Sequence, residues 1–327
     1  MVNEFGEAGL DHDLIEVMDE EVVLMPSGCL CCSIRGDLPG TLRDLFRRRD
    51  ADQVTFERIV IETTGLADPG PILQTFLVDA YLARYFRMDG VVTVVDAATG
   101  PETLNRQFEA ISQVAMADLL VMSKTDLVSE AAASAFETRL QTLAPTARIL
   151  KAERGVVPMA ALWDLSGMRP QSKPEQVKNW LSPQGAVSQK DPFENLSGLA
   201  ASNAHKATTP PATPHDARIG SASIVLDDPI PVANFDLWLD TLVSLRGPDI
   251  LRVKGIVHLE DMELPFVLHG VQHIFDQPVP MPNWPGEDRK SRVVIIARDM
   301  TQAELSRSFD MLRAVQSNKT DTSSMVG

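Results

Sequence analysis

The sequence predicts an α/β protein in which a parallel sheet with flanking helices is followed by a smaller α+β domain. The first observation is that short apolar runs ending in an acidic residue recur in the first half of the chain. The second is that helical stretches lie between these runs, and strands that alternate with helices are typical of a parallel sheet. The third is the length of 327 residues, which favours two domains over a single core.

The acid-tipped runs are the clearest strands. Residues 58–62, 90–96 and 117–126 each combine β-branched and apolar side chains, which is typical of a buried parallel strand. Ligands bind at the carboxyl edge of such sheets, so Glu62 and Asp96 mark an expected binding edge. The other elements expected in the first domain are helices at 38–49, 70–84, 102–116, 129–143 and 157–165 and a strand at 147–152.

All three cysteines lie within four positions, at Cys29, Cys31 and Cys32. We expect a loop that opens into a helix, where unpaired N–H groups favour the thiolate. Thiolates bind zinc, copper(I) or iron–sulfur clusters in preference to calcium or magnesium. The alternative is three buried, inert cysteines, but clustering in one polar turn favours metal or thiol chemistry. Three thiolates leave a tetrahedral site one ligand short, so a carboxylate, a histidine or a water has to complete it.

The net charge of -15 argues against broad electrostatic binding to nucleic acid or acidic membranes. No apolar run is long enough to span a bilayer, and the first residues are not typical of a signal peptide. Closely spaced thiols without an export signal indicate a reducing compartment. We therefore expect a cytoplasmic protein without nucleic-acid or membrane partners. The oligomeric state stays open, with a homodimer among the alternatives.

Composition divides the chain into a first domain at 1–165, a polar linker at 166–218, a second domain at 219–315 and a disordered tail at 316–327. In the second domain we expect strands at 221–226, 250–259, 265–275 and 292–297, a helix that Pro231 opens, and a final helix at 301–315 in which Thr301 and Glu304 form a capping box.

Two pairs of histidines are candidate metal ligands. His269 and His273 are four apart, so on one strand they would share a face. A second metal site is one interpretation, but half-buried, hydrogen-bonded strand histidines are commoner. His205 and His215 lie too far apart in the linker for helix-spaced or turn-spaced ligands, so we interpret them as solvated.

Four motifs stand out along the chain: Asn3-Glu4-Phe5-Gly6-Glu7, Gly28-Cys29-Leu30-Cys31-Cys32, Glu62-Thr63-Thr64-Gly65-Leu66-Ala67-Asp68-Pro69 and Ser123-Lys124-Thr125-Asp126. In their order and spacing they resemble the CobW-like P-loop GTPases, relatives of HypB and UreG, and the resemblance covers nearly the whole chain. It implies a P-loop-type sheet, a C-terminal split βαβ (ferredoxin-like) domain with helices on one face, and a GTP-driven metallochaperone. Such a protein delivers zinc, or cobalt or another divalent ion, to a client metalloprotein.

The resemblance also implies roles for single residues. Glu62 and Gly65 correspond to the switch element beside Mg²⁺ and the γ-phosphate of GTP. Lys124 and Asp126 correspond to the guanine-reading lysine and aspartate, and Ser123 stands where the family usually has asparagine. The metal ligands that it implies are Cys29, Cys31 and Cys32 with Glu7, and Glu4 as a further candidate.

The sequence departs from the family pattern at Ser123 and, more seriously, in lacking the phosphate-binding loop. These 327 residues contain no Gly-x-x-x-x-Gly-Lys-Ser/Thr, the loop that cradles phosphates and holds magnesium. In the family that loop precedes the Asn3–Glu7 motif by one strand and helix. We therefore expect an N-terminally truncated chain that binds GTP poorly and hydrolyses it barely. The alternative function is a nucleotide-independent metal-binding or scaffold protein.

Overall fold

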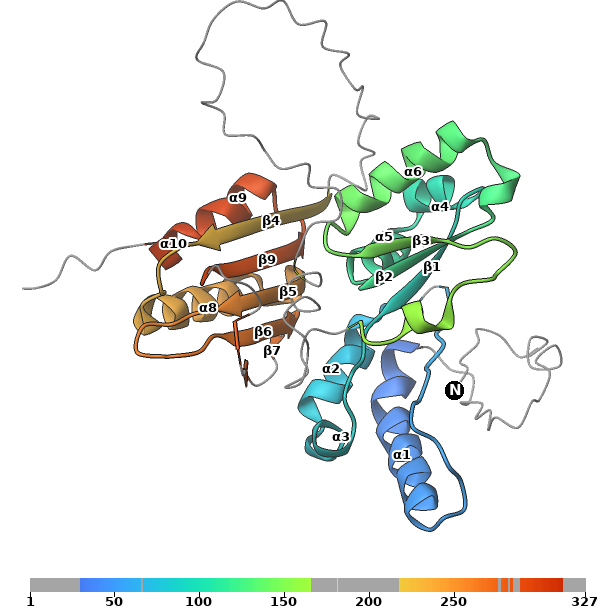
Figure 1. Ribbon diagram of the computed structural model, residues 1–327, viewed down its shortest axis with the longest axis horizontal. Helices are drawn as coiled ribbons and strands as arrows, with labels where there is room; N and C mark the ends of the chain where they lie inside the picture. The colour runs from blue at the N-terminus through green and yellow to red at the C-terminus, as the bar shows by residue number, and fades with distance from the viewer. Residues whose placement is uncertain are drawn as a thin grey trace, which may run out of the picture.

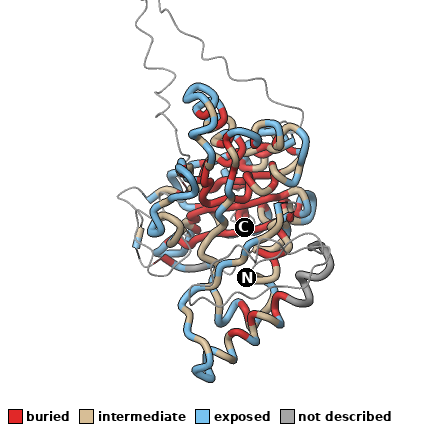
Figure 2. The backbone as a smooth tube through the Cα atoms, turned by 90° about the vertical axis from the view of Figure 1, so that its right-hand side faces the viewer, coloured by how far each residue is buried: buried red, intermediate tan, exposed pale blue. Residues whose placement is uncertain are grey.

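A computed structural model describes residues 30–65, 67–165, 181, 218–275, 278–281, 283–284 and 289–313, with the backbone alone at 30–37 and 279. It places two sheets side by side, each with its own helices, and a lobe of three helices projects below the first sheet (Figure 1). The buried residues gather at the two sheets (Figure 2). Among the described helices, none is both long and apolar enough to cross a membrane.

The first sheet is parallel, as predicted. In the described part of the chain it contains β1 (Val92–Asp96), β2 (Leu119–Ser123) and β3 (Arg148–Lys151), in that order. Val94 pairs with Val121, and Val121 pairs with Leu150. The carboxyl ends of the three strands therefore meet at one edge.

Helices cover one face of this sheet. They are α4 (Gly100–Arg106), α5 (Phe108–Ala115) and α6 (Glu130–Leu143), and they enclose a core in which Leu120 and Met122 of β2 meet side chains of all three helices. Ser129 caps α6 by accepting a hydrogen bond from the amide of Ala132. On the other face the predicted helix at 157–165 is wrong, because only a short 3₁₀ turn, η3 (Met159–Leu162), forms there.

The predicted buried strand at 58–62 is also wrong. Only Glu62 makes an isolated bridge, and Val60 is 59% exposed. Ile59 and Ile61 pack against the helices of the lobe instead. Apolar side chains in this segment do alternate between buried and exposed positions, as in a strand. The buried ones pack on helices, however, and the segment forms no β-ladder.

The lobe consists of α1 (Leu30–Asp50), α2 (Gly70–Val78) and α3 (Ala80–Tyr85), and its core joins Leu38 and Leu42 to Ile72 and Leu82. Helix α1 begins eight residues earlier than predicted and contains Pro39 in its interior. The single helices predicted at 70–84 and 102–116 are each two. Asp79 adopts an extended conformation and caps α3 through the amides of Tyr81 and Leu82, and Gln107 is extended between α4 and α5.

The second domain is antiparallel, with strand order β4 (Ile219–Leu226), β9 (Ser291–Arg298), β5 (Ile250–Val257), β6 (Phe266–Val271) and β7 (Ile274–Phe275), and β8 (Val279–Pro280) beside β6. The helix α8 (Val232–Arg246) and the turn η5 (Gly247–Asp249) join β4 to β5, and β9 lies between these two strands. This arrangement confirms the predicted split βαβ topology.

Two short helices, α9 (Gln302–Ser308) and α10 (Asp310–Arg313), replace the single helix expected at 301–315. The capping box that opens α9 is confirmed: Thr301 accepts from the amide of Glu304, and Glu304 accepts from the amide of Thr301. Trp238 of α8 is fully buried in the core of this domain and stacks near Phe309. The expected linker lies outside the described residues except Leu181, which packs against Ile256, and its last residue, Arg218.

The two domains share a buried contact. Leu73 of α2 and Met116 pack against Leu251, Val271 and Ile296 of the second sheet. Beside this apolar cluster, Arg252 and Lys254 of β5 pair with Asp118, the residue before β2. All three side chains are buried. The C-terminal sheet is therefore joined directly to the strand that leads to the predicted base-reading loop.

Candidate nucleotide and metal site

The carboxyl edge of the parallel sheet brings together residues from two of the predicted motifs. Asp96 at the end of β1 pairs in register with Ser123 at the end of β2. The Ser123 hydroxyl donates to the carbonyl of Val95 at 3.2 Å, which ties the two strand ends together. Ser123 thus fixes the backbone from which the next residue, Lys124, projects.

Lys124 has a left-handed backbone conformation with φ 55, which turns the chain sharply out of β2. Its ammonium group lies 2.7 Å from Oδ2 of Asp96. The other oxygen of Asp96 accepts from the amides of Ala98 and Thr99 at 2.7 and 3.1 Å. Partial burial raises the pKa of Asp96, but the hydrogen bonds from Lys124 and these amides outweigh it and lower the pKa to about 2.

Asp126 lies in the 3₁₀ turn η2 (Thr125–Leu127), which follows Lys124 directly, and it is exposed. A carboxylate has two oxygens that can accept hydrogen bonds from a guanine edge. Lys124 and Asp126 thus lie in the turn that follows β2, and their role in base recognition remains the expectation from the resemblance. Asp96, which the sequence marked only as a strand-tip acid, is a further member of this group.

The predicted switch segment, Glu62–Pro69, lies between the parallel sheet and the lobe of three helices. Glu62 is exposed, and the carbonyls of Gly65 and Ala67 accept hydrogen bonds from Nε2 of Gln113 at 3.1 and 2.8 Å. Asp68 accepts from the amide of Gly70 at 2.9 Å and so closes the turn into α2. Gln113 on α5 is a residue that sequence reasoning missed, because a lone glutamine on a helix carries no motif.

The structure places only part of the predicted metal site. Cys31 and Cys32 lie in the first turn of α1, within the helix and not in the loop predicted before it. Glu4, Glu7 and Cys29 lie outside the described residues. Within the described ranges, no group of three or more His, Cys, Asp or Glu residues is arranged to hold a metal ion.

The histidine prediction for the second domain is wrong in its geometry. His269 is buried in β6, whereas His273 is exposed in the turn after it, so the two do not share a strand face. Burial, followed by repulsion from Arg252, lowers the pKa of His269 to about 3, which keeps the ring neutral. His258 contacts the carbonyl of Met262 at 3.0 Å. His205 and His215 lie outside the described residues.

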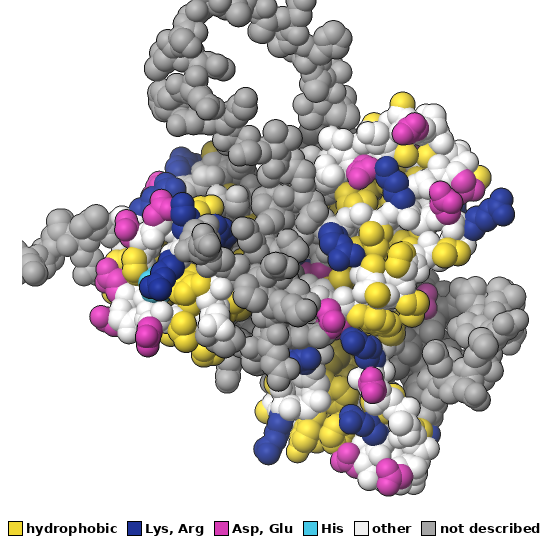
Figure 3. Space-filling model, in the orientation of Figure 1, with side chains coloured by type: hydrophobic (Ala, Val, Ile, Leu, Met, Phe, Trp, Pro, Cys, Tyr) yellow, Lys and Arg dark blue, Asp and Glu magenta, His cyan; other side chains and the backbone are white. Residues whose placement is uncertain are grey.

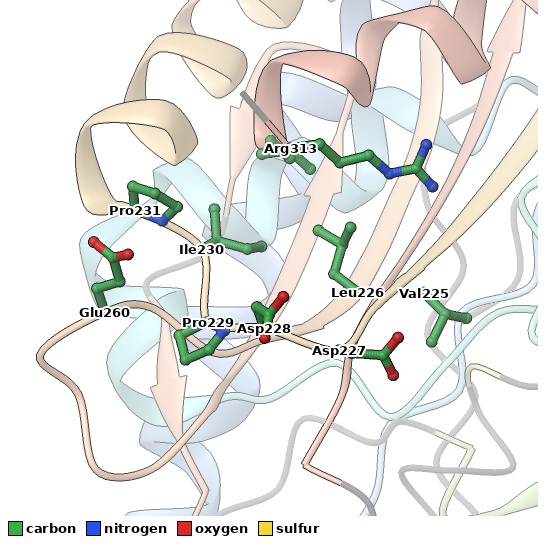
Figure 4. A pocket seen from close by; sticks show the side chains of 10 residues that line it. Val225, Leu226, Asp227, Asp228, Pro229, Ile230, Pro231, Glu260 and Arg313 are labelled. Carbon is green, nitrogen blue, oxygen red and sulfur yellow. The ribbon is translucent and has the colours of Figure 1, made fainter. Parts of the chain in front are cut away.

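A cavity of about 640 Å³ opens in the second domain, at the end of β4 and the start of α8 (Figure 4). Asp227, Asp228 and Glu260 line it together with Arg313. Asp227 is already paired with Lys290 at 2.7 Å. The cavity is formed entirely by the second domain, so it is no part of the edge that carries Lys124.

Comparison with known proteins gives the family. Residues 1–151 match the model of the CobW/HypB/UreG nucleotide-binding domain, and residues 219–313 match that of the cobalamin synthesis protein CobW C-terminal domain. The chain therefore belongs to the CobW family and combines both of its domains.

Several relatives are zinc proteins by name. The zinc chaperone YjiA of Escherichia coli strain K12 is 29% identical over 311 residues, which are 95% of this chain and 88% of that protein. The zinc chaperone CobW of Pseudomonas aeruginosa is 26% identical over 94% of this chain and 82% of its own length. The zinc-regulated GTPase metalloprotein activator 1 of Schizosaccharomyces pombe is 33% identical over 162 residues, covering 47% of this chain and 38% of that protein.

The fold has a solved counterpart. The crystal structure of the Zn(II)-bound YjiA GTPase from Escherichia coli aligns with a TM-score of 0.66 at 26% sequence identity, over 85% of this chain and 78% of that one. This likeness supports the two-domain architecture as a whole, the parallel sheet with flanking helices and the antiparallel C-terminal sheet.

Proposed function

We propose that this protein is a CobW-type metallochaperone that binds zinc at the Cys-x-Cys-Cys motif and delivers it to a client metalloprotein under control of GTP. The relatives named as zinc chaperones support zinc as the cargo. Cobalt or another divalent ion remains an alternative cargo, because soft thiolates with an oxygen ligand accept several of them.

The observation that carries the proposal is the packing of α1 on α2. Cys31 and Cys32 lie in the first turn of α1, and α2 begins directly after the Glu62–Pro69 switch segment. Leu38 and Leu42 of α1 meet Ile72 of α2 in one buried cluster. A movement of the switch segment would therefore reach the helix that carries two of the proposed zinc ligands. A nucleotide would change zinc affinity through a difference in that packing between the two states.

In this proposal Glu7, Cys29, Cys31 and Cys32 hold the metal, with Glu4 as a further candidate ligand. Glu62 and Gly65 respond to GTP and Mg²⁺. The base is read by Asp126 with the stem of Lys124 packed over the ring, and Ser123 steadies the loop.

The lack of Gly-x-x-x-x-Gly-Lys-Ser/Thr in these 327 residues supports the alternative, a nucleotide-independent metal-binding or scaffold protein. The same observation leads us to propose that this chain hydrolyses GTP poorly even if its relatives do so well. The two candidates share the zinc site and differ only in whether GTP alters it.

The zinc site is tested by titration against a competing chelator. The double variant Cys31→Ser/Cys32→Ser should lose tight, stoichiometric zinc binding, because a hydroxyl does not supply a thiolate. The neighbouring Ser33→Ala variant is the control and should bind like the native chain. Undiminished affinity in the double variant would refute the cysteine site.

A further inference from the structure

The helix that follows the switch segment rests on the C-terminal domain. The turn between β6 and β7 is centred on Gln272, whose backbone is left-handed with φ 56. The side-chain amide of Gln74 on α2 donates to the side-chain oxygen of Gln272. At the start of the same helix, a Cβ added to Gly70 would lie 3.2 Å from the Gln272 amide nitrogen. Gln272 is therefore in contact with both the first turn and the middle of α2.

Apolar packing supports this polar contact. Leu73 of α2 is 5% exposed and packs against Val271, the residue before Gln272, which is fully buried. The glycine at the start of α2 admits the approach of the turn, because any larger residue there would crowd Gln272 and Asp68. The joint between α2 and the turn is thus close-packed, and close-packed joints transmit small displacements.

The rest of the C-terminal sheet is anchored elsewhere. Arg252 of β5 pairs with Asp118 at 2.8 Å, next to β2 of the parallel sheet. The C-terminal sheet therefore has one contact beside β2 of the parallel sheet and another with α2, the helix that follows the switch segment. A shift of α2 relative to β2 would therefore bear on the β6–β7 turn and on the apolar cluster around Leu73.

From this geometry we propose that Gln272 is the contact through which the C-terminal domain senses the position of the switch segment. The nucleotide dependence of that position rests on the proposed function, but the mechanical coupling of Gln272 to α2 does not. Coupling is reciprocal, so loosening the turn must loosen the switch segment and α2 as well.

Hydrogen exchange measured by mass spectrometry on the full chain without nucleotide tests the coupling. Gln272→Gly suits the left-handed backbone and removes only the side-chain contact. Gln272→Asn also tolerates that backbone, but its shorter side chain holds the amide away from Gln74. The matched control is Asp261→Gly, because Asp261 has φ 66 in the exposed turn between β5 and β6, away from α2. Exchange in 62–78 is compared with exchange in 291–298 within each variant, so that a global loss of stability cancels.

Both Gln272 variants should raise relative exchange in 62–78 at least fivefold, whereas Asp261→Gly should leave it unchanged. In the reverse direction, Gln74→Met should raise exchange in 266–275. Equal exchange in 62–78 for native, Gln272 and Asp261 variants would overturn the proposal, and so would an equal rise in all of them. Because no nucleotide is present, this outcome is independent of whether GTP controls zinc affinity.

Discussion

Arg252 of β5 donates from one guanidinium nitrogen to both carboxylate oxygens of Asp118, at 2.8 Å each, across the contact between the two domains. The Arg252 and Asp118 side chains are 5% and 1% exposed. Lys254 donates to the same carboxylate at 2.8 Å, and the amide of Val91 donates at 3.0 Å. Asp118 thus carries one negative charge between two buried cations, which makes it the electrostatic centre of the domain contact.

Replacing Asp118 with asparagine should weaken the protein strongly. The variant leaves two buried cations without a counter-charge, and breaking a buried pair from one side costs about 3–5 kcal/mol of unfolding free energy. Denaturant unfolding followed by tryptophan fluorescence measures it. The control is Asp299→Asn, which removes an exposed pair with Arg218 and should leave the unfolding midpoint nearly unchanged. Equal midpoints for the two variants would contradict the role of Asp118.

The buried ammonium group of Lys254 should make the free energy of unfolding rise with pH. Burial and then repulsion from Arg252 lower the pKa of Lys254 from 10.5 to about 8, against the attraction of Asp118. Between about pH 8 and 10.5 the unfolded chain therefore binds more protons than the folded one, so the free energy of unfolding should increase as pH rises. Lys254→Met should abolish this increase and be at least as stable at pH 7, because Arg252 alone balances Asp118. If the stability of the native chain instead falls between about pH 8 and 10.5, in parallel with that of Lys254→Met, the lowered pKa of Lys254 is contradicted.

Asp126→Asn should change base preference. A carboxylate accepts from the guanine edge, whereas an amide can also donate, which suits xanthine. The chain alone should bind GTP poorly, so the variant is made in the chain preceded by a strand–helix unit that carries Gly-x-x-x-x-Gly-Lys-Thr. Competition of GTP and XTP for a fluorescent nucleotide should then shift toward XTP in the variant. The control is Thr125→Ser at the half-buried neighbouring position, which keeps the carboxylate and should keep the native preference. If the variant with asparagine selects bases as the native chain does, Ser123–Asp126 is not the reading loop.

Gln113→Met should loosen the switch segment without changing the fold. Methionine fills similar space, but it cannot donate to the carbonyls of Gly65 and Ala67. Limited proteolysis between residues 62 and 70 should become several-fold faster, while the melting temperature changes little. Glu109→Gln on the same helix is the control. Unchanged proteolysis would show that Gln113 does not restrain the segment.

The sequence predicted the elements whose signal is local. The strands that became β1, β2 and β3 are apolar runs with clear ends, and the capping box of Thr301 and Glu304 lies within four residues. The helix breaks at Asp79 and Gln107 were not predicted. In each case a single residue has an extended backbone within a sequence pattern that is otherwise helical.

What the sequence could not predict depends on distant partners. Residues 58–62 alternate like a strand, yet Ile59 and Ile61 pack on helices that come from elsewhere in the chain. Asp118 and Arg252 are separated by 134 residues, and neither belongs to a motif. The site shows the same division: Lys124 and Asp126 were predicted from their motif and Asp96 from its place at a strand end. Gln113, and the pairing of Asp96 with Lys124, emerge only from contacts in the structure.

The most direct test of the account is the zinc affinity of this chain, and of the same chain preceded by a strand–helix unit that carries Gly-x-x-x-x-Gly-Lys-Thr, each titrated against a chelator with and without GTP and Mg²⁺. We predict that the extended protein changes its zinc affinity at least tenfold on adding GTP, whereas the chain alone does not respond. Equal affinities under all four conditions would contradict nucleotide control and leave a plain zinc-binding protein.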